Sequence, residues 1–393
     1  MLQGKTGQGF VHTFSTRQRI ARKQSDDKMR GNPSTSVSFG KIGAFIFVLF
    51  LFFFLSSVNV FGGGSLGGEG PASLRTWRPI WGESSRKALS FAIVADLDRQ
   101  SKVKGSKNPT WKSYFKRGLL IPSSDGYDLQ WGDEEELTSQ FGEAGRGLEL
   151  SELVSFGKQL LTFDDRSGIV FEITKNLECI PRNILMEGDG NQAKGQKTEW
   201  ATVKDGKLYV GSFGKPFTNG DEIVNHWNLW VSIIDGNGVV SHEDWTDKYA
   251  LMQEVTKSSW PGYMIHEAIH WDDVHRVWYV LPRRVSSAKY DEKEDESMGS
   301  NLVLVFDETI SKLVRDPIEI GEKVPTHGWS SFKFLPHTRN NIIVGLRTME
   351  IENKATGDGS QNTFITVFDI EGNVLLRETM IPGDRKYEGI EFL

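Results

Sequence analysis

A strand pattern that recurs along residues 88–393 restricts the fold more than any other feature of this 393-residue chain. Short β-branched or aromatic runs with period-two alternation predict strands, and turn sequences such as Asp205-Gly206 separate them. The predicted strands are Ser90–Ala95, Leu160–Ile173, Lys207–Ser212, Trp230–Ile234, Val277–Leu281, Asn301–Phe306, Ile342–Leu346 and Thr363–Ile370. Helical periodicity is confined to short pieces such as Asp133–Phe141, so this body is predicted to be all-β.

A repeat underlies the strand pattern. Four times, a short segment of polar and apolar residues precedes a turn and a strand, and a fifth such segment follows at residues 387–389. Each segment contains an oxygen donor, and the five donors are Ser151, Glu199, Glu267, Ser330 and Glu388. Their offsets of 48, 68, 63 and 58 residues are typical of propeller blades, and about 305 residues at about 60 each would give five. A large β-sandwich with chance spacing is the alternative.

These five donors predict a metal site if the blades are radial. Equivalent positions on innermost strands converge on one axis, where three carboxylates need a cation or protons to offset their repulsion. Oxygen-only ligands at irregular spacing suit calcium better than zinc, and magnesium demands near-ideal octahedral geometry. The alternative is that the five are separate, solvated residues at strand ends.

Two familiar metal motifs are present in outline only. His266-Glu267-Ala268-Ile269-His270 matches the zinc-protease pattern, which requires a helix, but strand-like sequence follows closely and Trp260-Pro261-Gly262 precedes it. Asp189-Gly190-Asn191 resembles the start of an EF-hand loop, but Lys194 stands where that loop needs glycine. The first motif is not expected to form a zinc-protease site, and the second is not expected to form an EF-hand.

Acidic pairs and arginines suggest a phosphate site. Asp96-Leu97-Asp98 and Asp164-Asp165-Arg166 each end a predicted strand, as turn formers or as part of a site for a base and a metal-bound phosphate. Arg146, between two glycines, and Arg283 offer guanidinium forks suited to phosphate oxygens, although ordinary surface arginines are the alternative. The candidate catalytic residues are Asp96, Asp98, Asp165, Arg146 and Arg283.

The N-terminal part predicts a membrane anchor. Ile42–Phe61 is a run of twenty residues without a charge, long enough to span a bilayer core as a helix. Residues 1–41 carry a net charge of +6, which places them in the cytosol and the body across the membrane as a type II protein. Residues 62–87 form a glycine-rich stalk. The remaining charge of −12 disfavours nucleic acid, and the single cysteine, Cys179, excludes an intrachain disulfide.

Read together, several segments of the body resemble the calcium-activated nucleotidase (apyrase) family. They are AIVADLD (92–98), GRGLELSEL (145–153), FDDRSGIVFEI (163–173), GDGNQAKGQKTEW (188–200), KLYVGSFGK (207–215), PGYMIHEA (261–268), VLPRR (280–284), VPTHGWSSFKFLP (324–336) and KYEGIEFL (386–393). The resemblance implies a five-bladed propeller with one calcium in its central channel. By motif, the calcium ligands fall on the same five donors, and Asp96 and Asp165 match essential acidic positions. Two segments depart from the family's pattern, at Ala268 and at Trp329, and neither departure removes a ligand.

The resemblance also implies an activity. We expect calcium-dependent hydrolysis of the terminal phosphate of UDP, GDP and related nucleotides in the lumen of the endoplasmic reticulum or Golgi, by direct attack of water. An extracellular enzyme acting on ADP and ATP and a non-catalytic, calcium-stabilised propeller are the alternatives. The expected partners are nucleotides and, through residues 42–61, the membrane, with no nucleic acid; a homodimer and a secreted, cleaved form are left open.

Overall fold

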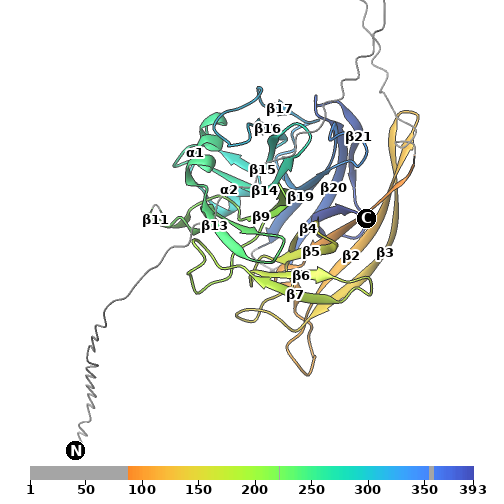
Figure 1. Ribbon diagram of the computed structural model, residues 1–393, viewed down its shortest axis with the longest axis vertical. Helices are drawn as coiled ribbons and strands as arrows, with labels where there is room; N and C mark the ends of the chain where they lie inside the picture. The colour runs from red at the N-terminus through yellow and green to blue at the C-terminus, as the bar shows by residue number, and fades with distance from the viewer. Residues whose placement is uncertain (1–86, 221, 354–357) are drawn as a thin grey trace, which may run out of the picture. The chain divides into compact units, whose positions relative to one another are not determined.

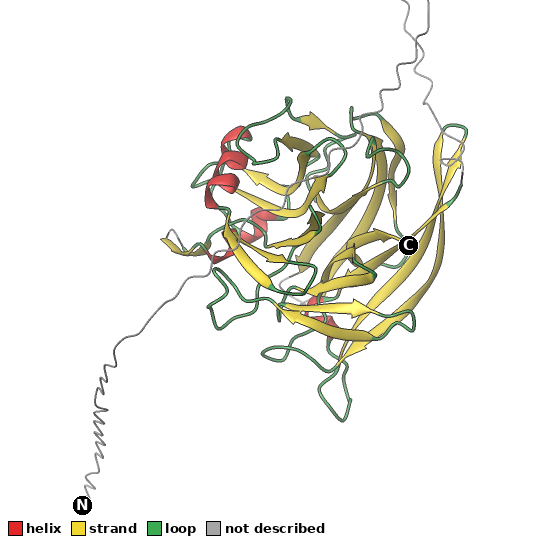
Figure 2. Ribbon diagram, viewed as in Figure 1, coloured by secondary structure: helices red, strands yellow, loops and turns green. Residues whose placement is uncertain are grey.

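The computed structural model describes residues 87–393 except 221 and 354–357. Within these residues the strands form five antiparallel sheets of four strands each and one separate hairpin (Figures 1 and 2). From the innermost strand outward, the first sheet contains β22 (Lys386–Phe392), β1 (Leu89–Asp96), β2 (Trp111–Ser123) and β3 (Gly126–Ser139). The second contains β4 (Leu150–Phe156), β5 (Gln159–Asp164), β6 (Ile169–Ile173) and β7 (Cys179–Ile184).

The other three sheets repeat this order. The third contains β8 (Trp200–Lys204), β9 (Lys207–Gly211), β12 (Trp230–Ile234) and β13 (Val240–Asp244), and the hairpin β10 (Phe217–Asn219) and β11 (Glu222–Asn225) lies between β9 and β12 in the chain. The fourth contains β14 (Tyr263–Asp272), β15 (Val277–Ser286), β16 (Leu302–Phe306) and β17 (Ile318–Glu319). The fifth contains β18 (His327–Phe334), β19 (Ile342–Asn353), β20 (Asp358–Asp369) and β21 (Val374–Met380).

The five sheets are the blades of a propeller. Their innermost strands contact one another in the closed order β22, β4, β8, β14, β18 and back to β22. The ring closes because β22, the last strand, pairs with β1, the first, from Phe91 opposite Phe392 to Asp96 opposite Lys386. The structure therefore confirms the predicted all-β, five-bladed propeller.

The hydrophobic core is divided into five clusters, one between each pair of adjacent blades. Phe91 and Val344 belong to the cluster between the first and fifth blades, and Trp200 and Trp278 to the one between the third and fourth. Because both faces of each blade are covered, the inner strands are buried along most of their length, as in β18, where all eight residues are buried. This burial explains the many aromatic residues of the body.

One predicted local structure is wrong. Asp133–Phe141, which has helical periodicity, lies mostly in β3 and ends two residues beyond it. The acidic residues of this segment pair across to basic residues of β2: Lys112 Nζ is 3.3 Å from Glu136 Oε2, and Arg117 contacts Glu135. Cross-strand pairing with β2 outweighs the local helical preference of this segment.

Helices are few among the described residues. They are α1 (Thr246–Val255), α2 (Glu292–Asp295) and the 3-10 turns Asp98–Ser101 and Trp227–Leu229. The helix α1 packs Tyr249 and Met252 into the core between the third and fourth blades. Neither the sequence pattern nor the repeat predicted this helix.

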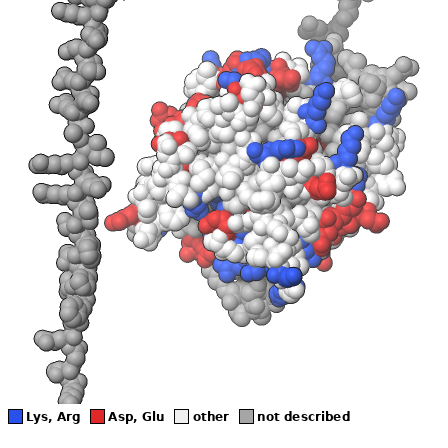
Figure 3. Space-filling model, turned by 60° about the horizontal axis from the view of Figure 1, so that its bottom comes forward, with Lys and Arg blue, Asp and Glu red and all other residues white. Residues whose placement is uncertain are grey.

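The predicted anchor Ile42–Phe61, the basic tail 1–41 and all of the stalk except residue 87 lie outside the described residues. Among residues that are described, no helix is long and apolar enough to span a bilayer. On the face of the body shown in Figure 3, basic side chains stand among acidic ones and form no continuous basic surface.

Candidate functional site

The five predicted oxygen donors lie on or beside the five innermost strands. Ser151 is in β4, Glu267 in β14, Ser330 in β18 and Glu388 in β22, and Glu199 immediately precedes β8. All five are buried. Each blade thus contributes one buried donor on or beside its innermost strand.

Three of these donors, Glu199, Glu267 and Glu388, line a cleft of about 700 Å³. Ser151 and Ser330 lie outside its lining: their hydroxyls donate to the carbonyls of Thr198, at 2.6 Å, and Tyr387, at 3.4 Å. Those carbonyls directly precede Glu199 and Glu388 in the chain. The same cleft is lined by all five candidate catalytic residues, Asp96, Asp98, Asp165, Arg146 and Arg283.

Two basic side chains each contact two carboxylates of the cleft, and at least one of each pair belongs to the channel carboxylates Glu199, Glu267 and Glu388. Lys197 Nζ lies 2.6 Å from Asp165 Oδ2 and also contacts Glu199. Arg283 Nη1 lies 2.9 Å from Glu388 Oε1 and also contacts Glu267. Arg283, predicted to bind phosphate, is therefore engaged by two of the predicted calcium ligands.

Lys386 is a third basic side chain that lies among several carboxylates of the cleft. Its Nζ lies 2.6 Å from Asp96 Oδ2, 3.2 Å from Asp98 Oδ2 and 3.6 Å from Glu388 Oε1. It also lies 3.9 Å from a carboxylate oxygen of Glu350, so one ammonium faces four carboxylates.

Sequence reasoning missed both lysines, although a signal for them exists. Lys197 and Lys386 each stand two residues before a predicted calcium ligand, in Lys197-Thr198-Glu199 and Lys386-Tyr387-Glu388. Residues two apart in extended chain share one face, so the same spacing in two blades directs a cation and a carboxylate into the channel.

Arg146 is held by a buried acid. Its Nε donates to Glu149 Oε1 at 2.8 Å, a second contact forms through Nη2, and Asp98 Oδ1 lies 3.6 Å away. Glu149 is completely buried. Asp96, Asp98 and Glu149 each present a carboxylate oxygen within 4.8 Å of the others, a grouping that the sequence did not predict.

Asp165 has one engaged and one free oxygen. Lys197 binds Oδ2, whereas Oδ1 is buried without a hydrogen-bond partner among the residues described here. The backbone N–H of Asp165 donates to the carbonyl of Glu149 at 3.0 Å, which fixes the loop after β5. The free oxygen could accept a proton from a water in the cleft.

Burial and mutual repulsion shift the pKa values of the acids. Burial raises the pKa of Glu388 to about 7 and that of Glu199 well above its usual value, in spite of the neighbouring lysines. Burial, with repulsion by Asp98, also raises the pKa of Asp96 well above its usual value. Lys386 is the main cause of the opposite shift in Asp98, whose pKa falls to about 2.

The lining of the cleft has an excess of negative charge and only oxygen ligands. It contains ten carboxyl groups against seven basic groups, so the protein's own cations do not balance it. The described lining includes no histidine or cysteine, and oxygen-only donor sets favour hard cations. The residues present therefore fit calcium.

The two histidines of the zinc-protease pattern and the EF-hand-like segment lie outside the lining of this cleft, although Glu267 of the first motif belongs to it. His266–His270 is in strand β14, not in a helix, as expected. His266 is fully buried against Tyr249, with ring centroids 5.2 Å apart, and His270 contacts the hydroxyl of Thr202. The exposed Asp189 forms a local turn by accepting from the N–H of Asn191 at 3.1 Å.

Comparisons with known proteins agree with the geometry. The family model Apyrase matches residues 97–393. The chain is 40% identical over 317 residues to an apyrase of Cimex lectularius, covering 79% of this chain and 84% of that one. It is 42% identical over 308 residues to soluble calcium-activated nucleotidase 1 of Rattus norvegicus, covering 77% and 73%. It is 37% identical over 316 residues to apyrase apy-1 of Caenorhabditis elegans, covering 79% and 86%.

Proposed function

The chain belongs to the apyrase family, and on that premise we propose that it removes the terminal phosphate of UDP, GDP and related nucleotides and depends on calcium. Membership supports a nucleotide-phosphate hydrolase. The observation that supports the finer statement is the single cleft that joins three buried channel carboxylates to Asp165, Asp96 and basic side chains.

Glu199, Glu267 and Glu388 would hold the ion, with oxygens of Ser151 and Ser330 on the neighbouring strands. Bound calcium would neutralise phosphate charge and order the acidic loops. A site with irregular protein oxygens accommodates the flexible coordination of calcium better than the strict octahedron of magnesium.

Arg283, Lys386 and Lys197 supply positive charge for the phosphate groups. All three line the cleft, and phosphoryl transfer depends mainly on positioning and on neutralising charge. Arg146 lines the cleft too, and Glu149 fixes the orientation of its guanidinium, which can face a phosphate oxygen as a fork.

Asp165 would take the proton of the attacking water at Oδ1, its free oxygen. The water oxygen forms a bond to the terminal phosphorus in line with the bond that breaks. The products are inorganic phosphate and the nucleotide shortened by one phosphate. Asp96 is the second candidate for this base, but both of its oxygens have partners: Oδ1 accepts from the N–H of Asp98 at 2.7 Å, and Oδ2 lies 2.6 Å from Lys386 Nζ.

A phosphate-release assay on purified residues 88–393 tests this activity. UDP, GDP, ADP and ATP are each offered with calcium, and with magnesium plus a calcium-selective chelator. We expect hydrolysis of UDP and GDP in calcium only. Equal UDP hydrolysis in magnesium with the chelator would refute the calcium dependence.

We also propose that the protein is a single-pass type II membrane protein with its body in the lumen of the secretory pathway. The support is the uncharged run Ile42–Phe61 behind a tail of net charge +6. Protease added to sealed microsomes should spare the body until detergent is added. Digestion of the body without detergent would reverse the topology.

A further inference from the structure

A second cavity, of about 460 Å³, adjoins the acidic cleft. Lys215 and Tyr290 line both spaces, together with Pro216 and Thr218, so the two share part of their walls. Whereas the cleft is lined mainly by charged groups, this cavity is lined largely by aromatic and aliphatic side chains. Its volume is in the range of small-molecule sites in proteins.

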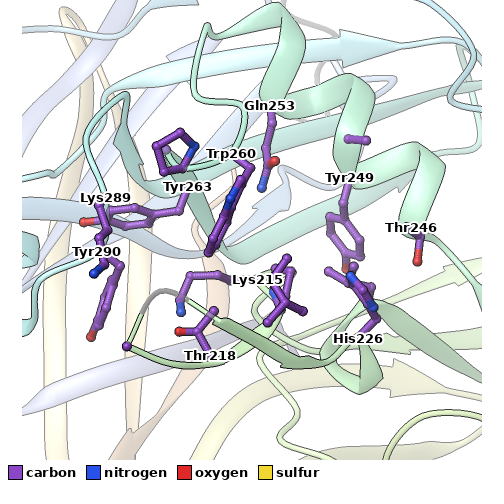
Figure 4. Close-up of a pocket in the computed structure, with 17 residues that line it drawn as sticks. Lys215, Thr218, His226, Thr246, Tyr249, Gln253, Trp260, Tyr263, Lys289 and Tyr290 are labelled. Atoms are coloured by element: carbon purple, nitrogen blue, oxygen red, sulfur yellow. The ribbon is translucent and has the colours of Figure 1, made fainter.

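Two aromatic side chains of the cavity are unusually exposed. The Trp260 side chain is 49% exposed, and no described ring stacks on it. Tyr290 is 36% exposed, and its ring lies 5.2 Å from that of Tyr263 at an interplanar angle of 76°. Figure 4 shows Trp260, Tyr263 and Tyr290 on one side of the cavity. Exposed rings of this kind are stacking surfaces for planar heterocycles.

The rings are held in place. The hydroxyl of Tyr263 donates to Asp295 Oδ1 at 2.7 Å, so its ring is fixed behind Tyr290. Lys215 Nζ lies 4.4 Å from the centre of the Tyr290 ring and faces it as a cation. The cavity therefore has a preformed aromatic wall.

A polar group is available beside Trp260 (Figure 4). Gln253 projects from α1 toward the cavity (Figure 4), and within the described part of the chain its side-chain amide makes no hydrogen bond. An amide offers both a donor and an acceptor, which can pair with the edge of any nucleobase. Stacking with one adaptable polar contact gives affinity without strict selection among bases.

Lys215 marks the junction between the two spaces. Burial lowers its pKa, and Asp295 opposes this shift, so the ammonium is a cation partly removed from water. It lies between the aromatic cavity and the cleft that holds the candidate catalytic acids. A nucleotide has the same order of parts: a base, then a ribose, then negative phosphates.

We infer that this cavity binds the nucleobase of the substrate, with Trp260 and Tyr290 as stacking surfaces and Lys215 beside the phosphate nearest the ribose. The inference rests on the proposed nucleotidase function and deepens it. Because every base has a stacking face, the site accepts both pyrimidine and purine nucleotides.

Steady-state kinetics of Trp260→Ala and Tyr290→Ala test the inference. Inhibition by UMP, which has a base, is compared with inhibition by inorganic pyrophosphate, which has none. We expect KM for UDP and Ki for UMP to rise about tenfold in each variant, since stacking is lost. Ki for pyrophosphate should stay within about twofold, and Trp260→Phe should restore most of the affinity.

Trp227→Ala is the matched control. This indole is 38% exposed but packs beside Gly188, outside the cavity lining, so KM should not change. An unchanged KM in Trp260→Ala and Tyr290→Ala, or an equal loss of pyrophosphate binding, would overturn the inference and leave the nucleotidase function standing. If the variants instead differ from the unmodified protein in sedimentation coefficient and not in KM, Trp260 and Tyr290 would be assigned to a contact between two copies of the chain, and the inference would be overturned. Absence of UDP hydrolysis in the unmodified protein would refute the proposed function, and this inference with it.

Discussion

Asp165 combines a restrained carboxylate with one unpartnered oxygen, which suits a group that accepts a proton. Asp165→Asn keeps the shape and removes the basicity, so we expect turnover to fall by roughly 10²–10⁴ while calcium affinity changes little. Glu267→Gln should instead weaken calcium binding, and added calcium should recover part of the activity. Calcium titrations followed by thermal shift and by UDP hydrolysis separate the two. Near-normal turnover in Asp165→Asn would make Asp96 the better candidate.

Lys197 competes with any cation that binds Glu199, because its ammonium already contacts that carboxylate. We therefore expect Lys197→Met to tighten calcium binding by about tenfold, measured by calorimetry. Lys215→Met is the matched control: Lys215 lines the same cleft, and the described contacts show no ion pair between it and a channel carboxylate. Equal calcium affinities in the unmodified protein and in Lys197→Met would refute the competition.

His266 makes the folded protein sensitive to acid. It is fully buried with both ring nitrogens unpartnered among the described residues, and burial lowers its pKa to about 3. The pKa of His266 in the folded protein lies below the unfolded value of about 6.5. The stability that depends on a neutral His266 is therefore fully present above pH 6.5 and is lost as the pH falls toward 3. At pH 5 the loss is about 2 kcal/mol. Urea unfolding measures the free energy of unfolding at pH 7.5 and at pH 5. The decrease between these two pH values should be about 2 kcal/mol smaller in His266→Asn than in the unmodified protein.

At the scale of elements, close packing between an inner-strand aromatic and a second-strand glycine recurs. In the third blade, a Cβ at Gly211 would lie 2.1 Å from Trp200 Cε2, and Trp200 is fixed by donating to the carbonyl of Ser212 at 3.1 Å. Gly345 meets Trp329 in the same way in the fifth blade, where its Cβ would lie 2.6 Å from the indole.

Gly211→Ala should therefore destabilise the protein by about 1–3 kcal/mol, since Trp200 has no room to move away. Gly236→Ala is the control, because a Cβ at Gly236 would meet no atom within 4 Å. Thermal unfolding of both variants in calcium tests this, and we expect a lower melting temperature for Gly211→Ala than for Gly236→Ala. Equal melting temperatures would show that the third blade accommodates the added methyl group without loss of stability.

The strands were predictable where side chains alternate and turn pairs separate them, as in Trp230–Ile234, which is found with the same bounds. Asp133–Phe141 was not, because its conformation depends on pairing with β2, more than ten residues earlier in the chain. The marker residues of the five blades were found by their spacing. The ion pairs of Lys197 and Lys386 join residues of different strands. They could not be predicted, because the sequence does not show which strands lie side by side at the axis.

At the scale of the whole molecule, a bound ion would connect blades. Glu199, Glu267 and Glu388 belong to the third, fourth and first blades, so their common ligand restrains all three. We expect calcium at about 100 times its Kd to add about 2.7 kcal/mol of stability and to raise Tm by several degrees. Magnesium should do less. If a calcium chelator leaves Tm unchanged, calcium does not bind between these three blades, and the proposed ligand set is wrong.

The closing strand β22 also sets an order of events during synthesis. Lys386 and Glu388, which face the cleft, belong to the strand that completes the first blade, although that blade's other strands are made before all the rest. A nascent chain therefore holds an open ring and an incomplete candidate site until β22 has left the ribosome. Chains interrupted before that point would be both unclosed and catalytically silent, so folding and the onset of activity coincide in a single late step.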